Sequence, residues 1–333
     1  MRRNWISAYL LLVALWGGSY AVTDIALTGL APSGVVMWRS IIGAAFLAVL
    51  LTISGRGLPR LGRADILRIC LLGALTTGGQ LSCSIAQTRL PSGLVAVLCS
   101  MTPLISVVIF WLRRTPIPPL KWLCLCLSVA GVAVLLSPEV RLDNVGITLG
   151  LLTAVLFSMA GVLSADFFPD STFTGTQLTV AQLVVTAALM APVNLLTSTD
   201  RQFPPKAGPL VAVLALGVLA AGVGNALFWR VLRSAGPVFT GTTHQLVPVV
   251  AVIFGVAVLD EPLGLGEVIG AGLVFAGLAL LLPLVRVAGN QTEDPRLEES
   301  LIGVHCEEPC NCGNLEAVRR EHTERMQLRP ATS

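Results

Sequence analysis

Ten apolar stretches, each about as long as a helix needs to cross a lipid bilayer, dominate the chain. About 20 apolar residues span the roughly 30 Å of hydrocarbon, and backbone groups in lipid need partners within the span, which favours helices. The 333 residues are 54% hydrophobic and 12% charged, whereas charged residues make up roughly 25% of an ordinary soluble domain. We therefore predict an all-α polytopic membrane protein with ten transmembrane helices at residues 5–28, 35–53, 66–88, 93–112, 120–136, 146–165, 176–196, 210–229, 237–259 and 264–285.

Lys and Arg residues near the helix ends predict the orientation, because positively charged loops stay on the cytoplasmic side. With the N-terminus inside, most of these residues fall on the cytoplasmic side. This predicts that both termini are cytoplasmic. The loop at residues 166–175 is predicted to be cytoplasmic, although it contains no Lys or Arg.

A long segment of the chain occurs twice. Residues 93–136 read like residues 238–281: each copy has an apolar helix with a central proline, Pro103 or Pro248, then a proline-containing turn and a second apolar helix with glycine. The similarity extends upstream, so that each copy comprises five predicted helices. We expect a first repeat at residues 1–137, a second at 138–286, and a largely disordered cytoplasmic tail at 287–333.

The turns of the two copies carry opposite charges. The first has Arg113 and Arg114, and the second has Asp260 and Glu261. A duplicated loop that changes sign is expected to have changed sides of the membrane, and an odd number of helices per copy requires the same inversion. The pattern predicts two inverted five-helix repeats, an arrangement that builds transporters.

Two stretches resemble the drug/metabolite transporter superfamily, EamA type. They are the run LLLVALWGGSYAVTDIALTGLAPSGVVMWRSIIGAAFLAVLL in the first two predicted helices and residues 248–277, which include Leu259-Asp260-Glu261-Pro262. The resemblance implies a ten-helix transporter of small organic solutes that works by alternating access in the bacterial inner membrane. The chain departs from the family where the first copy has Arg114-Thr115-Pro116 in place of an acidic residue before proline.

The two central prolines mark a candidate binding site. A proline inside a helix removes one backbone hydrogen bond and frees the carbonyl four residues earlier, here those of Cys99 and His244. Paired helix breaks in corresponding positions of two repeats point to a binding site at the membrane midplane. Polar residues precede both prolines: Ser100 in the first copy, and Thr243, His244 and Gln245 in the second. The alternative is that both prolines serve only as packing kinks.

A polar stripe runs along the third predicted helix. It recurs at steps of three and four residues, which places its members on one helix face: Thr76, Thr77, Gln80, Ser84 and Gln87. Such a face avoids lipid and either lines a cavity or bonds to a neighbouring helix.

Aromatic and charged residues complete the candidate set. Trp16 and Tyr20 share a face of the first helix and are expected either to line a cavity or to anchor the helix at the interface. Arg39 is expected to reach the interface, to pair with Asp24, or to bind a substrate carboxylate. His244 and Asp24 are candidates for proton coupling, because a membrane-buried histidine can titrate near neutral pH; a neutral, hydrogen-bonded histidine is the alternative.

The predicted substrate-binding residues are therefore Trp16, Tyr20, Arg39, Thr77, Gln80, Ser84, Ser100, Thr243, His244 and Gln245, with Pro103 and Pro248 breaking their helices. We expect no cofactor and no catalytic residue. In the tail, His305, Cys306, Cys310 and Cys312 are weak candidates for a metal site, because their spacing matches no standard pattern.

The sequence predicts a secondary transporter of small organic metabolites, and the resemblance to the EamA type implies that it is an exporter. It lacks a Walker-type loop, which excludes ATP-driven transport by this chain alone, and its basic residues lie at helix ends rather than in a patch for nucleic acid. The expected partners are a small organic solute and the lipid bilayer, with the protein a monomer or homodimer. A channel, receptor or scaffold is the first alternative, and a polytopic membrane enzyme is the second.

Overall fold

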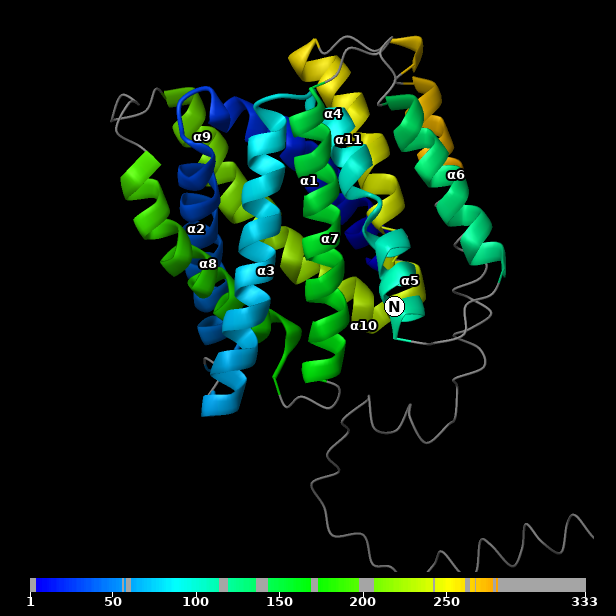
Figure 1. Cartoon of the computed structure of the whole chain (residues 1–333). Helices are drawn as coiled ribbons and strands as arrows, with labels where there is room; N and C mark the ends of the chain where they lie inside the picture. The colour runs from blue at the N-terminus through cyan, green and yellow to red at the C-terminus, as the bar shows by residue number, and fades with distance from the viewer. Residues whose placement is uncertain are drawn as a thin grey trace, which may run out of the picture. The chain divides into compact units, whose positions relative to one another are not determined.

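The computed structural model describes most of the chain up to residue 280. The described residues are 4–55, 57, 61–113, 119–135, 143–168, 173–197, 207–241, 243–260, 264–266, 268–277 and 280. Their regular secondary structure is entirely helical (Figure 1), which confirms the predicted all-α class. The tail, with its weak metal candidates His305, Cys306, Cys310 and Cys312, lies outside the described residues.

The helices follow the apolar stretches closely. In chain order they are α1 (Asn4–Leu27), α2 (Pro32–Ile53), α3 (Arg63–Gln87), α4 (Ser92–Cys99), α5 (Thr102–Leu112), α6 (Pro119–Leu135), α7 (Asn144–Phe167), α8 (Gly175–Thr197), α9 (Ala207–Ala215), the π-helix η1 (Leu216–Gly224), α10 (Asn225–Gly241) and α11 (Thr243–Leu259). Proline begins α2, where its missing N–H costs no hydrogen bond.

Seven helical segments of the described chain are long and apolar enough to cross a membrane. Two shorter apolar helices follow them, Leu246–Leu259 and Val268–Gly277. The multi-pass architecture agrees with the sequence, while the count of ten spans stays a prediction.

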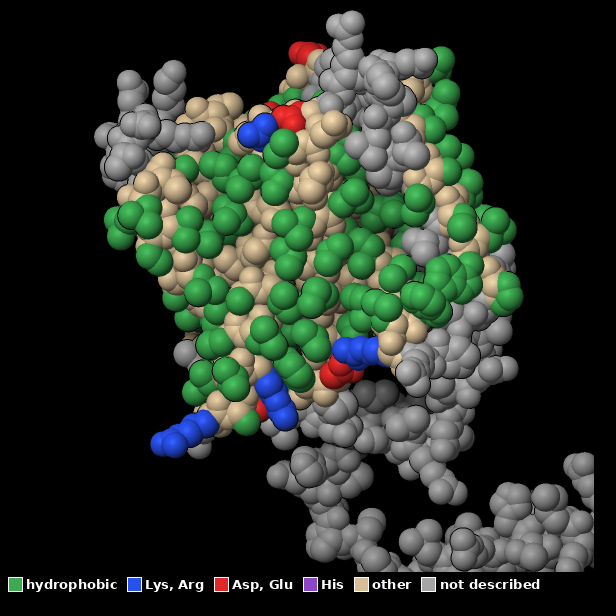
Figure 2. Space-filling model, viewed as in Figure 1, with side chains coloured by type: hydrophobic (Ala, Val, Ile, Leu, Met, Phe, Trp, Pro, Cys, Tyr) green, Lys and Arg blue, Asp and Glu red, His purple; other side chains and the backbone are tan. Residues whose placement is uncertain are grey.

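The outer surface of the bundle is apolar. Large aliphatic side chains are exposed on several helices, for example Leu67, Leu195 and Val211, which are 74%, 76% and 64% exposed. In Figure 2 hydrophobic side chains cover the middle of the visible face, and the charged side chains gather toward its upper and lower edges. A soluble protein rarely exposes so much contiguous apolar surface, so this surface is suited to lipid.

Small residues let the helices approach closely. An added Cβ at Gly73 of α3 would lie 2.5 Å from Val185 of α8, and one at Gly79 would lie 2.6 Å from the Phe157 ring of α7. Lipid tails are as apolar as leucine, so helices in membranes associate largely through such close packing. The same device joins the predicted fifth and tenth helices, because a Cβ at Gly131 would lie 2.6 Å from the Gly270 carbonyl.

Helices α4–α5 and α11 run in opposite directions. Gly93, near the start of α4, lies against Val252 in the second half of α11. In Figure 1 the chain descends through α4 and α5, and it ascends through α11. These are the corresponding proline-containing helices of the two sequence copies.

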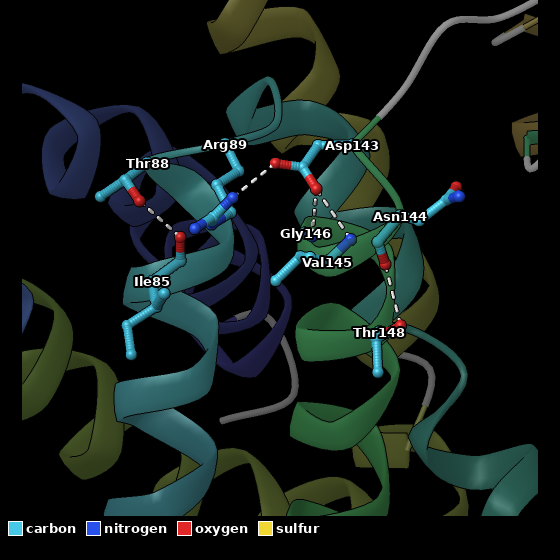
Figure 3. Close-up of polar contacts among 8 residues, drawn as sticks. All are labelled: Ile85, Thr88, Arg89, Asp143, Asn144, Val145, Gly146 and Thr148. Carbon is cyan, nitrogen blue, oxygen red and sulfur yellow. Dashed lines mark hydrogen bonds and ion pairs between the residues drawn. The ribbon is translucent and has the colours of Figure 1, made fainter.

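Ion pairs fix both ends of α7 to its neighbours. Arg89, after α3, donates to the Asp143 carboxylate at 2.7 Å (Figure 3). At the other end of α7, Arg113 donates to Asp166, also at 2.7 Å, and Arg68 donates to the Phe167 carbonyl at 3.2 Å. Arg113 and Arg68 therefore lie at the same end of the bundle as the start of the 166–175 loop, which was predicted to be cytoplasmic although it lacks basic residues of its own.

Asp143 also caps α7. Its carboxylate accepts hydrogen bonds from the backbone N–H groups of Val145 and Gly146. The hydrogen bond from Arg89 makes the largest contribution to lowering the pKa of Asp143 below its ordinary value, and the two backbone hydrogen bonds lower this pKa further.

A carboxyl group whose pKa is lowered on folding stabilises the folded protein at pH values above its unfolded pKa, and this contribution is lost as the pH falls through the lowered folded value. We therefore expect Asp143→Asn to lower the melting temperature at pH 7, and the difference from wild type to shrink below about pH 4. Thermal unfolding in detergent between pH 3 and pH 7 measures this. In an Arg89→Gln background Asp143→Asn should lower the melting temperature by less. If Asp143→Asn lowered the melting temperature equally at every pH, and equally with and without Arg89, the Arg89–Asp143 ion pair would not be the cause.

Candidate functional site

An interhelical cavity of about 580 Å³ opens between helices from both sequence copies. Its lining residues come from α1 to α5 of the first copy and from α7, α8, η1, α10 and α11 of the second copy. The polar members of its lining are Ser19, Tyr20, Thr23, Arg39, Thr76, Gln80, Cys83, Ser84, Gln87, Cys99, Ser100, Thr102, Ser106, Ser158, Thr179, Gln182, Thr186 and Asn225. A volume of this size suits a small organic molecule.

Most of the polar stripe on α3 faces this cavity. Thr76, Gln80, Ser84 and Gln87 all belong to its lining. The Oε1 atoms of Gln80 and Gln87 are buried and have no hydrogen-bond partner in the described part of the chain. A buried acceptor without a partner is costly, so a partner that enters the cavity would relieve that cost.

Thr77 lies elsewhere. It is buried between α3 and α8, where its hydroxyl donates to the Gly73 carbonyl at 2.6 Å and to Thr186 Oγ1 at 2.9 Å. For this residue the structure shows the helix-to-helix bonding that was the alternative interpretation. Thr77 directly follows the cavity-facing Thr76, but successive side chains of a helix point in directions about 100° apart, so Thr77 faces α8 instead of the cavity.

Trp16 and Tyr20 of α1 both line the cavity. The Trp16 indole stacks on Phe228 with a centroid distance of 5.4 Å, and its Nε1 donates to the Ala220 carbonyl at 3.2 Å. Tyr20 packs against the core cluster that contains Cys99. The stacking on Phe228 and the hydrogen bond to Ala220 thus fix the orientation of the indole, which forms an aromatic part of the cavity lining.

The acceptor of the Trp16 hydrogen bond belongs to η1, a stretch of π-helix that the sequence did not predict. Added Cβ atoms at Gly217 and Gly224 would lie 2.5 Å from Ile42 and from Trp16 Nε1, respectively. Two glycines therefore allow α1 and α2 to approach this segment. π-Helical segments occur frequently at functional sites, and this one forms part of the cavity wall.

Arg39 of α2 reaches the cavity from the first copy. Its Nε atom is buried without a hydrogen-bond partner, and the side chain takes part in none of the ion pairs among the described residues. The expected pairing with Asp24 is not among these ion pairs. Asp24 is half-buried on α1 and is not among the cavity-lining residues.

The helix break at Pro103 is real, but the freed carbonyl is occupied. The chain leaves α4 at Cys99 and enters α5 at Thr102. The Thr102 hydroxyl donates to the Cys99 carbonyl at 2.7 Å, and the Ser100 hydroxyl donates to the Val97 carbonyl at 2.6 Å. The Cys99 carbonyl, which was expected to be freed by Pro103, therefore accepts the Thr102 hydroxyl in place of the missing backbone donor. Ser100 and Pro103 still line the cavity.

Pro248 lies within α11, which stays helical around it, and Pro248 also lines the cavity. Thr243 is fully buried, its Oγ1 has no partner in the described part of the chain, and it is not in the cavity lining. The side chains of His244 and Gln245 lie outside the described residues.

Sequence reasoning missed the contribution of α8. Thr179, Gln182 and Thr186 recur at three- and four-residue steps and all line the cavity. The rule that found the α3 stripe would have found this one. Phe157 and Ser158 of α7 carried no comparable signal, because they are isolated in an apolar helix.

Helices long enough to span a bilayer, surrounding a partly polar cavity, define a multi-pass membrane protein with an internal solute-sized site. The chain belongs to the EamA-like transporter family, whose model matches it twice, at residues 3–137 and 144–282. It is therefore a membrane transporter of the drug/metabolite transporter superfamily, and each match covers one of the two sequence copies.

Two named relatives are similar to the chain over most of its length. Protein PecM of Dickeya dadantii (strain 3937) is 26% identical over 295 residues, which cover 86% of this chain and 94% of PecM. The uncharacterized inner membrane transporter YedA of Escherichia coli (strain K12) is 23% identical over 81% of this chain and 88% of YedA. A protein crystal structure that is 19% identical superposes with a TM-score of 0.62, covering 86% of this chain and 99% of that one, and supports the fold.

Proposed function

We propose that the protein is a secondary transporter that exports small organic metabolites across the cytoplasmic membrane by alternating access. The observation that carries this proposal is the interhelical cavity, which is lined from both copies and contains buried polar atoms that have no partner among the described residues. A cavity between two repeats is where transporters of this kind bind their solutes.

In this proposal the two copies, residues 1–137 and 138–286, form inverted five-helix repeats with ten spans. Three observations support it: the double match to the family, the reversed charges of the two connecting turns, and the opposite directions of α4–α5 and α11. Both termini are cytoplasmic by the distribution of Lys and Arg, and the protein works as a monomer or homodimer.

The proposed binding residues are those of the predicted set that reach the cavity, namely Trp16, Tyr20, Arg39, Gln80, Ser84 and Ser100. His244 and Asp24 remain proposed carriers of a coupling proton. A channel would use the same cavity without alternating closure. An enzyme is disfavoured, since the family is a transporter family and the relative YedA is named as a transporter.

The test compares extracellular metabolites of cells that overproduce wild type or Gly161→Leu. Gly161 lines the cavity, and an added Cβ there meets no atom within 4 Å. The leucine side chain can therefore start into the cavity from an unobstructed Cβ, and it should strongly reduce or abolish any wild-type increase in an extracellular metabolite. Gly208→Leu on α9 is the matched control, because an added Cβ there also meets no atom within 4 Å and Gly208 lies outside the cavity lining. Equal efflux by all three proteins, or no effect of wild type on any metabolite, would refute the proposal.

A channel is distinguished in proteoliposomes with a metabolite found in that comparison. A transporter should accumulate the labelled solute against its own unlabelled pool by counterflow. Flux without counterflow would favour the channel.

A further inference from the structure

The charge of the described cavity lining is positive. Arg39 is the charged member of the described lining, which contains no Asp, Glu or Lys. We propose that the transported solute is a small organic anion whose carboxylate binds the Arg39 guanidinium. This inference rests on the proposed transport function and specifies its substrate class.

Arg39 differs from the other described arginines that were assigned contacts. Arg68, Arg89 and Arg113 lie at the ends of the bundle and donate to carboxylate or carbonyl oxygens there. Arg39 instead lies within a spanning helix, and its buried Nε atom has no hydrogen-bond partner among the residues that the structure describes. A charged group in a membrane interior needs a compensating partner, and the planar guanidinium fork matches a carboxylate with two parallel hydrogen bonds.

The rest of the lining specifies what accompanies the carboxylate. The unpartnered Oε1 atoms of Gln80 and Gln87 can only accept hydrogen bonds, so the solute should carry a neutral donor, such as a hydroxyl or an N–H group. Trp16, Tyr20 and Phe157 offer aromatic surface for a flat apolar body. A cationic solute would find a like charge in Arg39 and no described carboxylate in the lining to balance it.

The repeat adds a second reason to assign the specificity to Arg39. Upstream of the segment compared above, the two copies correspond at an offset of about 143 residues, so the counterpart of Arg39 is Gln182, which also lines the cavity. The two equivalent positions thus offer one guanidinium and one neutral amide. Charge recognition is therefore expected to depend on the first copy alone.

The experiment measures, by mass spectrometry, the extracellular metabolites of cells that overproduce wild type, Arg39→Gln or Arg39→Lys. Metabolites exported by wild type should be predominantly carboxylates. Arg39→Gln should reduce their efflux roughly tenfold or more, because hydrogen bonds between charged groups are stronger than those between neutral groups. Arg39→Lys should retain part of the efflux. Since Arg39 has no described protein partner to lose, the melting temperature of Arg39→Gln should equal or exceed that of wild type; a purely structural arginine would lower it.

Purified protein provides the second measurement. Binding is measured by isothermal titration calorimetry with indole-3-acetate, indole-3-acetamide and tryptamine, which share one ring system and carry a negative, neutral or positive group. Wild type should bind the carboxylate at least tenfold more tightly than the amine, and Arg39→Gln should lose this preference. Binding of the amine as strong as that of the carboxylate, or failure of all three to bind at millimolar concentration, would overturn the proposal.

The two proposals fail in different ways. If wild type exports cations or neutral solutes and Gly161→Leu blocks them, transport stands and the anion assignment is wrong. If no metabolite depends on the protein, the transport proposal itself fails.

Discussion

Gly17→Ala is expected to destabilise the protein by about 1–3 kcal/mol, the usual cost of overpacking a tight contact. The new Cβ would lie 2.6 Å from Val250 Cβ and 2.9 Å from the Val247 carbonyl oxygen. Backbone and a branched side chain cannot move aside cheaply, so α1 and α11 would have to separate. These helices come from different copies, and the substitution should lower the melting temperature in detergent.

The neighbouring glycine provides the control. A Cβ at Gly18 would lie 3.5 Å from the Phe254 ring, which is ordinary contact. Gly18→Ala should therefore be neutral, or slightly stabilising because alanine favours helix. If both substitutions gave the same melting temperature, the close approach of α1 and α11 at Gly17 would be incorrect.

Replacement of Trp16 should impair both stability and transport. Trp16→Ala removes the stacking on Phe228 and the hydrogen bond to Ala220. We expect the free energy of unfolding to fall by about 3 kcal/mol, which is the lower end of the range for Trp-to-Ala substitutions, because the ring is half-buried. Trp16→Phe keeps a ring but leaves the Ala220 carbonyl without its side-chain donor, so about 1 kcal/mol is expected. Metabolite efflux should fall severalfold in Trp16→Phe and be lost in Trp16→Ala.

Trp111 is the matched control for both measurements. It is 50% exposed on α5 and contacts Trp122 edge to face, away from the cavity lining. Trp111→Phe should leave efflux unchanged. Normal efflux by Trp16→Phe, or equal loss in Trp111→Phe, would remove Trp16 from the proposed binding site.

The candidate site could be predicted in part, because the polar stripe on α3 and the face of α1 follow from helical periodicity. Periodicity placed Gln80 and Ser84 on one face of α3 and Trp16 and Tyr20 on one face of α1, and all four line one cavity. Periodicity has a resolution of about one residue, however, and so it did not separate Thr77 from its neighbour.

The broken helix shows a second limit of the sequence. Pro103 correctly predicts the loss of a backbone donor, but which atom replaces it depends on the rotamer that a nearby hydroxyl adopts. In the folded chain the Thr102 hydroxyl supplies a hydrogen bond to the Cys99 carbonyl, which the sequence alone did not predict.

The sequence by itself determined the helical class, the spanning lengths, the duplication and the reversed charges of the two turns. These depend on local composition and on backbone hydrogen bonds that each helix satisfies alone. The tertiary structure decided which polar groups face the cavity, the π-helical turn that receives Trp16, and the unpartnered state of the Arg39 Nε atom. Such features depend on contacts between residues up to about two hundred positions apart, as between Trp16 and Ala220, and no local pattern encodes them.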